Sequence, residues 1–117
     1  IMIKDNHYNK KNLSKIIENG KTKFPNLKIE VEVENFTQLK KVMLENVDII
    51  MLDNWPINKV QEAIKMIRDK NKNILIEISG GIDSNNISEY AKYSPNFISS
   101  GSITHSPMSI DLSLEKD

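Results

Sequence analysis

Short apolar segments alternate along this chain with segments of helical periodicity, and no other feature limits the possible folds so strongly. The expected strands are Met2–Lys4, Lys28–Glu34, Asp48–Leu52, Asn73–Ser79 and Asn96–Ser99. The expected helices are Lys11–Asn19, Thr37–Asn46, Ile57–Asp69 and Ser84–Tyr93. Strands separated by single helices predict right-handed βαβ units and therefore a parallel sheet.

An apolar stripe and candidate helix caps support this pattern. An apolar stripe at helical spacing predicts that the third helix packs on a sheet; it consists of Val60, Ala63, Ile64 and Ile67. Gly20 stands where a C-terminal cap is expected, and Thr37 and either Asp83 or Ser84 stand where N-caps are expected.

The chain has 117 residues, which allows one small domain. A complete (β/α)8 barrel takes about 250 residues, so the five units fit either the second half of a barrel or a small doubly wound sheet. The apolar run Ile1–Ile3 predicts a strand that needs neighbours, which favours a barrel of which the first part is missing. We therefore expect residues 1–117 to form a partial (β/α) barrel domain.

Composition excludes several classes of function. Lys plus Arg and Asp plus Glu both number 16, so no basic surplus supports binding of nucleic acid or anionic membranes. The absence of cysteine excludes disulfides and thiolate chemistry and fits a cytoplasmic protein. No apolar run approaches the ~20 residues that span a bilayer.

One chemically distinctive residue lies near the end of each expected strand: Lys4, Glu32, Asp53, Ser79 and Gly101. The ends of parallel strands point the same way, so these residues should converge on one face, where ligands of α/β folds bind. This spacing predicts a shared site.

Each of these residues also has a purely structural interpretation. In KIEVEVEN, Glu30, Glu32 and Glu34 alternate with apolar residues, as on an edge strand with one solvated face; in a central strand they would need a cation, a hydroxyl-rich ligand or charge partners. Asp53 is also a plausible helix cap or turn residue, and His7 and His105 are weak indications when taken singly.

The glycine-containing turns are more specific. Ser79, Gly80 and Gly81 follow an apolar strand and precede an expected helix, and Gly101 stands between two serines one unit later. Glycines allow close approach of the backbone to a ligand, and a helix N-terminus offers free N–H groups. Barrel enzymes commonly hold a phosphate with the loops after their last two strands, so this pair of turns predicts a phosphate site.

Several motifs then match one family in order and spacing: IKDNH, EVEVEN, IIMLDN, EISGGI, SGSITHS and SIDLSL. Over essentially its whole length the chain resembles the C-terminal part of the quinolinate phosphoribosyltransferases, also called carboxylating nicotinate-nucleotide pyrophosphorylases. The resemblance implies a type II phosphoribosyltransferase, in which an N-terminal sandwich domain precedes an open (β/α) barrel. These enzymes join quinolinate to phosphoribosyl pyrophosphate in the presence of Mg2+, and release pyrophosphate and CO2 to give nicotinate mononucleotide for NAD synthesis.

The matching motifs assign roles to individual residues as the resemblance implies them. Lys4 is the active-site lysine near the substrate carboxylates and pyrophosphate, and Glu32 and Asp53 are the acids near the ribose hydroxyls and the magnesium ion. The metal is expected to bind through the substrate, without a direct protein ligand. The 5-phosphate pocket comprises Ser79, Gly80, Gly81, Ser100, Gly101 and Ser102, with His105 at its edge.

The resemblance also shows what this chain does not contain. The family binds the two carboxylates of quinolinate with a basic cluster from the sandwich domain and the early barrel strands, whereas this sequence has a single arginine, Arg68. We therefore expect the chain to be inactive alone, and the resemblance implies that it functions within a homodimer or higher homo-oligomer. The alternatives are a related enzyme of the nicotinate type or of the ModD type, or a non-catalytic fragment that binds sugar phosphates.

Overall fold

The computed structural model describes residues 1–4 and 12–99, and within them five strands alternate with four helices. The strands are β1 (Met2–Ile3), β2 (Glu30–Val33), β3 (Ile49–Asp53), β4 (Leu75–Ser79) and β5 (Phe97–Ile98). The helices are α1 (Leu13–Lys23), α2 (Phe36–Val42), α3 (Ile57–Lys70) and α4 (Ile87–Ala91). The predicted order of βα units is confirmed.

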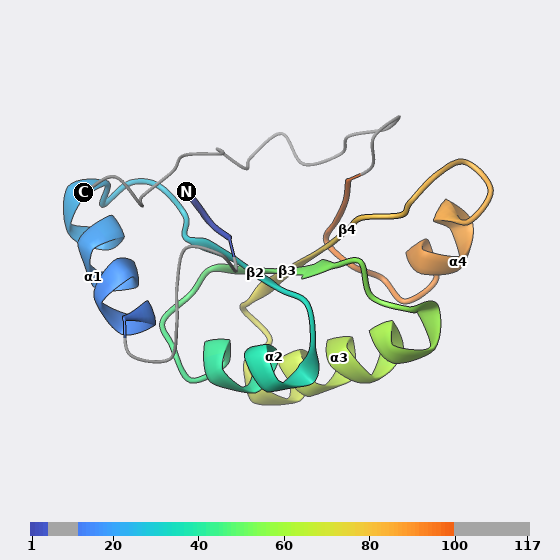
Figure 1. The fold of residues 1–117 in the computed structure, drawn as a ribbon, viewed down its shortest axis with the longest axis horizontal. Helices are drawn as coiled ribbons and strands as arrows, with labels where there is room; N and C mark the ends of the chain where they lie inside the picture. The colour runs from blue at the N-terminus through green and yellow to red at the C-terminus, as the bar shows by residue number, and fades with distance from the viewer. Residues whose placement is uncertain (5–11, 100–117) are drawn as a thin grey trace.

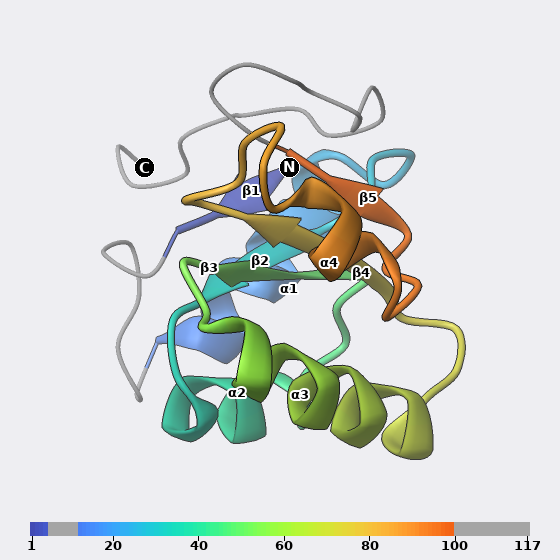
Figure 2. The same cartoon turned by 90° about the vertical axis from the view of Figure 1, so that its right-hand side faces the viewer.

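All strands are parallel and stand in the sheet in their sequence order, β1-β2-β3-β4-β5. The helices lie on one side of this sheet, with α2 and α3 beneath the central strands and α1 and α4 at its two ends (Figure 1). The view turned by 90° again shows α2 and α3 beneath the strands (Figure 2). A doubly wound sheet would have helices on both faces. The described part of the chain is therefore wound in one direction, as in a (β/α) barrel.

The face of the sheet toward the helices is apolar and forms the core. Its strand residues are Ile3, Val31, Val33, Ile50, Leu52, Ile76 and Ile78, all almost fully buried. The expected stripe of α3 packs against them, because Val60, Ala63, Ile64 and Ile67 are the buried residues of that helix. The pattern on α3 thus predicted its packing correctly.

The opposite face of the sheet, which we call the inner face, contains several carboxylates. Glu30 is only 1% exposed and pairs in register with Ile49, and Glu32 pairs with Met51. Strand β2 lies between β1 and β3, so the interpretation of KIEVEVEN as a solvated edge strand is wrong. Only Glu34, beyond the end of β2, is exposed.

Helix α1 does not end at Gly20. The helix continues to Lys23, and the buried Gly20 accepts a hydrogen bond from the N–H of Phe24, the C-cap residue. Pro25 follows this cap, and proline lacks the N–H that a further helical turn would need. A glycine that is buried inside a helix can serve close packing instead of capping, which explains why the C-cap expectation at Gly20 is wrong.

Two expected N-caps are also displaced. The Asn35 side chain accepts a hydrogen bond from Gln38 N and caps α2, so Thr37 lies inside the helix. Asp83 accepts hydrogen bonds from the N–H groups of Asn85 and Asn86 in a turn, and α4 begins only at Ile87 with Asn86 as its N-cap. At α2 the Asn35 side chain makes the capping hydrogen bond, whereas Asn86 at α4 makes none and the Asp83 side chain closes the preceding turn instead. Among the described residues, no helix has the length and apolarity that a membrane crossing requires.

Candidate active site

The ends of β3 and β4 bring the predicted acid and the first glycine turn together. Asp53 and Ser79 are register partners at the ends of these strands, and the N–H of Asn54 donates to the carbonyl of Ser79 at 2.8 Å. Gly80 and Gly81 directly follow Ser79 in the sequence. The expectation that Asp53 and the Ser79–Gly81 turn share one edge of the sheet is therefore confirmed.

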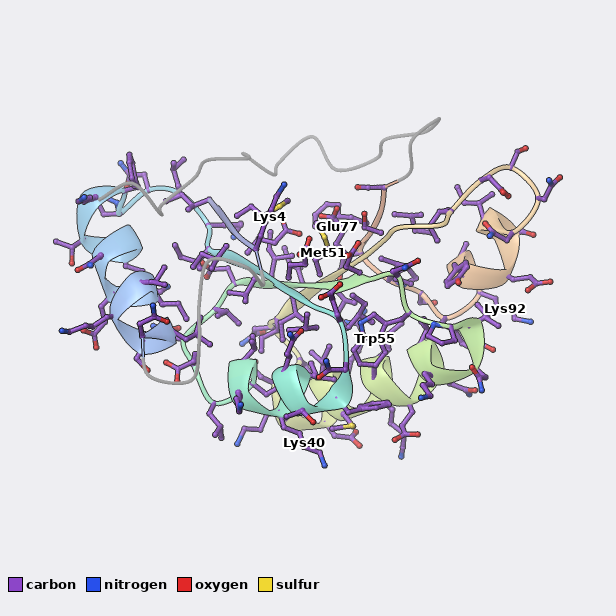
Figure 3. The ribbon with its side chains drawn as sticks, in the orientation of Figure 1. Lys4, Lys40, Met51, Trp55, Glu77 and Lys92 are labelled. Atoms are coloured by element: carbon purple, nitrogen blue, oxygen red, sulfur yellow. The ribbon has the colours of Figure 1, made fainter. Side chains whose placement is uncertain are left out.

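Lys4 and Glu32 approach the same region from the neighbouring strands. Ile3 pairs with Val31, and the residues that follow this pair are Lys4, directly after β1, and Glu32 in β2, both half-buried. Figure 3 shows Lys4, Met51 and Glu77 on the inner face, on the side of the sheet away from α2 and α3. An amine and several carboxylates thus share the face that the described helices leave uncovered.

A buried tryptophan fixes the turn that follows Asp53. Trp55 is 3% exposed, and its Nε1 donates to the carbonyl of Val33 at 2.9 Å. Its ring lies edge-on to Phe36, with ring centroids 4.8 Å apart, and its own carbonyl accepts a hydrogen bond from the Tyr90 hydroxyl. Because Val33 directly follows Glu32, this indole ties the end of β2 to the end of β3, and so the two acids to each other.

Glu77 also lies on the inner face, although the sequence analysis did not single it out. It is 2% exposed, lies beside Met51 in the register of β3 and β4, and accepts a hydrogen bond from Ser99 Oγ at 2.7 Å. The signal was present, since a carboxylate in the middle of the apolar strand LIEIS needs a partner when it is buried. This hydrogen bond links the middle of β4 to the residue that follows β5.

The helix expected to begin at Ser84, after the first glycine turn, begins only at Ile87. The Asp83 turn separates Gly81 from α4, and Asn86 Nδ2 donates back to the carbonyl of Gly81. Helix α4 is also only five residues long. Any anion at this turn would therefore contact the backbone of the glycines and not a helix end.

Other predicted site residues lie outside the described residues, namely Ser100, Gly101, Ser102 and His105. Arg68 lies on α3 and donates to the carbonyl of Ser94 at 2.9 Å and to Asn96 Oδ1. This arginine is therefore engaged on the helix side of the sheet, away from the inner face.

The inner face offers oxygen donors that suit a hard divalent cation. In residues 1–4 and 12–99, no group of three His, Cys, Asp or Glu side chains is arranged to hold a metal ion. Mg2+ commonly keeps several waters and binds through one or two carboxylates together with substrate phosphates. An ion bound in this way, mainly through a substrate, needs no cluster of three protein ligands.

Comparisons with known proteins agree with this geometry. Residues 1–115 match the family model described as "Quinolinate phosphoribosyl transferase, C-terminal domain". The chain is 43% identical to a probable carboxylating nicotinate-nucleotide pyrophosphorylase of Methanocaldococcus jannaschii, over 98% of this chain and 42% of the relative. It is 32% identical to a putative pyrophosphorylase ModD of Pasteurella multocida, over 86% of this chain and 36% of the relative.

A solved structure gives the same result. The nicotinate-nucleotide pyrophosphorylase of Francisella tularensis superposes with a TM-score of 0.76 at 34% identity, over 88% of this chain and 36% of that one. The chain thus spans less than half the length of these proteins. The strand order, the acids and the SGG turn occur in the context that the sequence predicted, and the chain belongs to the family of quinolinate phosphoribosyltransferase C-terminal domains.

Proposed function

We propose that this chain forms the ribose- and phosphate-binding half of a carboxylating nicotinate-nucleotide pyrophosphorylase. The reaction transfers the phosphoribosyl group of phosphoribosyl pyrophosphate to the nitrogen of quinolinate and releases pyrophosphate and CO2. The observation that supports it most strongly is the register pair Asp53–Ser79, which places a carboxylate beside the Ser79–Gly81 turn on the inner face. Membership of the family is the reason why we assign phosphoribosyl transfer to the site around Asp53 and Ser79.

The residues suit the charges that develop in this reaction. Departure of pyrophosphate from the anomeric carbon builds positive charge on the ribose, as in glycoside cleavage. Carboxylates of Glu32 and Asp53 beside the sugar would stabilise that charge and accept hydrogen bonds from the ribose hydroxyls. The Lys4 ammonium would offset the negative charge of the departing pyrophosphate or of the quinolinate carboxylates.

We further propose that Ser79, Gly80 and Gly81 bind the 5-phosphate, together with Ser100, Gly101, Ser102 and His105. Backbone N–H groups and serine hydroxyls are the usual partners of a phosphate in such a turn. Mg2+ would bind through the substrate, close to Glu32 and Asp53, and would neutralise charge on the pyrophosphate.

The proposal extends to the protein as a whole. The basic groups for the two carboxylates of quinolinate would come from an N-terminal sandwich domain and earlier barrel strands, because the arginine of this chain faces the helix side. The uncovered inner face fits a homodimer in which the sandwich domain of one subunit covers the barrel of the other. A cytoplasmic location belongs to the same proposal, since NAD synthesis of this kind uses soluble substrates.

A segment exchange tests the function. The matched C-terminal segment of the Methanocaldococcus jannaschii relative is replaced by this chain, and formation of nicotinate mononucleotide and CO2 is measured with phosphoribosyl pyrophosphate and Mg2+. We expect turnover with quinolinate, loss of turnover with Glu32→Gln in the exchanged segment, and little turnover with nicotinate as the acceptor. A preference for nicotinate would favour the related enzyme type, and a folded hybrid with no turnover on either acceptor would contradict the proposal.

A further inference from the structure

Gly80 packs against the end of the neighbouring strand so closely that no side chain fits there. A Cβ atom at this position would lie 2.9 Å from Asp53 Oδ1, 2.9 Å from Asn54 N and 3.1 Å from Asn54 Cα. Carbon atoms in contact normally stay about 3.5–4.0 Å from their neighbours. The space that glycine leaves open at position 80 is therefore occupied by the Asp53 carboxylate and by the Asn54 backbone.

Gly81, the next residue, differs in this respect. Both glycines have left-handed backbones, with φ of +81° at Gly80 and +68° at Gly81, so a side chain at either position strains the backbone to a similar degree. A Cβ at Gly81, however, would meet only Asn54 Oδ1, at 3.4 Å. The two glycines therefore share one backbone requirement but only Gly80 contacts the carboxylate of Asp53.

The surroundings of this contact are held firmly. Asn54 also has a left-handed backbone, with φ of +60°, and its N–H donates to the carbonyl of Ser79. The residues on either side of the contact are thus joined by a 2.8 Å hydrogen bond and by the register of β3 and β4. An atom added at Gly80 would therefore press on both the Asp53 side chain and the Asn54 backbone, and of these two only the side chain can move without disturbing the hydrogen bond to Ser79.

We propose that Gly80 is a positioning residue for Asp53: its missing side chain sets where the Asp53 carboxylate lies on the inner face. The inference rests on the proposed function only in assigning Asp53 to the ribose. Misplacing a reacting group by about 1 Å can reduce a rate about 100-fold, so a contact of this kind has functional weight. A side chain at Gly80 would then act on the ribose through Asp53, whereas Gly81 would serve the 5-phosphate pocket without contacting that carboxylate.

The first measurement follows the carboxylate directly in the 117-residue chain. The 13Cγ chemical shift of Asp53 is recorded by NMR for the wild type, Gly80→Ala and the matched control Gly81→Ala. We expect Gly80→Ala to move the Asp53 signal clearly and Gly81→Ala to leave it nearly in place. Equal displacement by both variants, or none by Gly80→Ala, would overturn the proposal. This outcome does not depend on whether the chain binds any substrate.

The second measurement is a double-mutant cycle of Gly80 and Asp53. Isothermal calorimetry gives the dissociation constant of phosphoribosyl pyrophosphate, in the presence of Mg2+, for each variant. Gly80→Ala should weaken binding about tenfold in the wild type but less than twofold in an Asp53→Ala background, because the carboxylate through which Gly80 acts is then gone. Gly81→Ala should have the same effect in both backgrounds. Equal effects of Gly80→Ala in both backgrounds would overturn the proposal. A wild-type chain that does not bind this substrate contradicts the proposed function instead, and the NMR result then decides the role of Gly80.

Gly80→Ala can also be too unstable to measure, and this case is decided by thermal unfolding. If the Asp53 carboxylate is the main obstacle, Asp53→Ala should restore a cooperative transition to the Gly80→Ala chain. A double variant that remains as unstable as Gly80→Ala, beside a folded Gly81→Ala, would show that the Asn54 backbone is the critical contact and would overturn the proposal.

Discussion

The indole Nε1 of Trp55 donates a hydrogen bond to the backbone carbonyl of Val33 at 2.9 Å, inside the core. Trp55 follows the Asp53–Asn54 turn by one residue, and Val33 follows Glu32. Besides the pairing of β2 with β3, this buried hydrogen bond and the packing of the indole against Phe36 hold the two acids assigned to the ribose in their relative position.

Trp55→Phe removes this donor and leaves the buried carbonyl of Val33 without it. We expect a loss of about 1–3 kcal/mol in the free energy of unfolding, which is the usual result for a buried polar group that loses its partner. Denaturant unfolding followed by circular dichroism measures this loss. The matched control is Tyr90→Phe, which removes a half-buried hydrogen bond to the carbonyl of Trp55 and should cost only about 0.5–1.5 kcal/mol. A smaller loss for Trp55→Phe than for Tyr90→Phe would contradict this account.

The cap of α2 gives a second prediction. Asn35→Ala removes the side chain that accepts a hydrogen bond from Gln38 N and should destabilise the chain by about 1 kcal/mol. Thr37→Ala, inside the helix and exposed, should change stability by no more than about 0.5 kcal/mol. Thermal melts of the two variants distinguish the observed cap from the one that the sequence suggested. The reverse order of effects would place the cap at Thr37.

The pair Glu77–Ser99 provides a third prediction. Because Glu77 is buried, Ser99→Ala should cost about 1–3 kcal/mol in the free energy of unfolding. The loss should be much smaller in a Glu77→Leu background, where no buried acceptor remains. Denaturant unfolding of the wild type, the two single variants and the double variant yields the coupling free energy between Glu77 and Ser99. Purely additive losses would show that this hydrogen bond contributes nothing to stability.

A fourth prediction concerns the isolated 117-residue chain. Its single arginine donates to Ser94 and Asn96 on the helix side, so quinolinate would lack the bidentate partners that carboxylates usually have. We expect no formation of nicotinate mononucleotide above that of a Glu32→Gln control, in an assay of the purified chain with both substrates and Mg2+. Turnover clearly above this control would mean that the chain contains a complete site.

Local patterns predicted the strands, the order of the βα units and the buried stripe of α3, because alternation and helical periodicity are properties of neighbouring residues. The convergence of Asp53 with Ser79 also followed from sequence, since parallel strands end on the same edge. The caps were less predictable because several Asn, Asp, Ser and Thr residues compete for each helix start, and Asn35 prevailed over Thr37 through the backbone conformation at that position.

Local sequence patterns could not predict the long-range contacts. The hydrogen bond of Trp55 to Val33 spans 22 positions, and that of Ser99 to Glu77 spans another 22. The contact of Gly80 with Asp53 depends on the register and twist of β3 and β4 together. The sequence indicated a glycine that requires close approach; only the fold shows that a carboxylate of the same chain makes this approach.

The most direct test of the central claim is the steady-state kinetics of Asp53→Asn in the segment-exchanged enzyme. This change preserves the shape of the side chain and removes the charge that would oppose the positive charge developing on the ribose. We expect kcat to fall about 100-fold or more, the scale of losing one well-placed electrostatic group, with a smaller change in KM for phosphoribosyl pyrophosphate. An unchanged kcat, or an effect confined to KM, would contradict the assignment of Asp53 to the transition state.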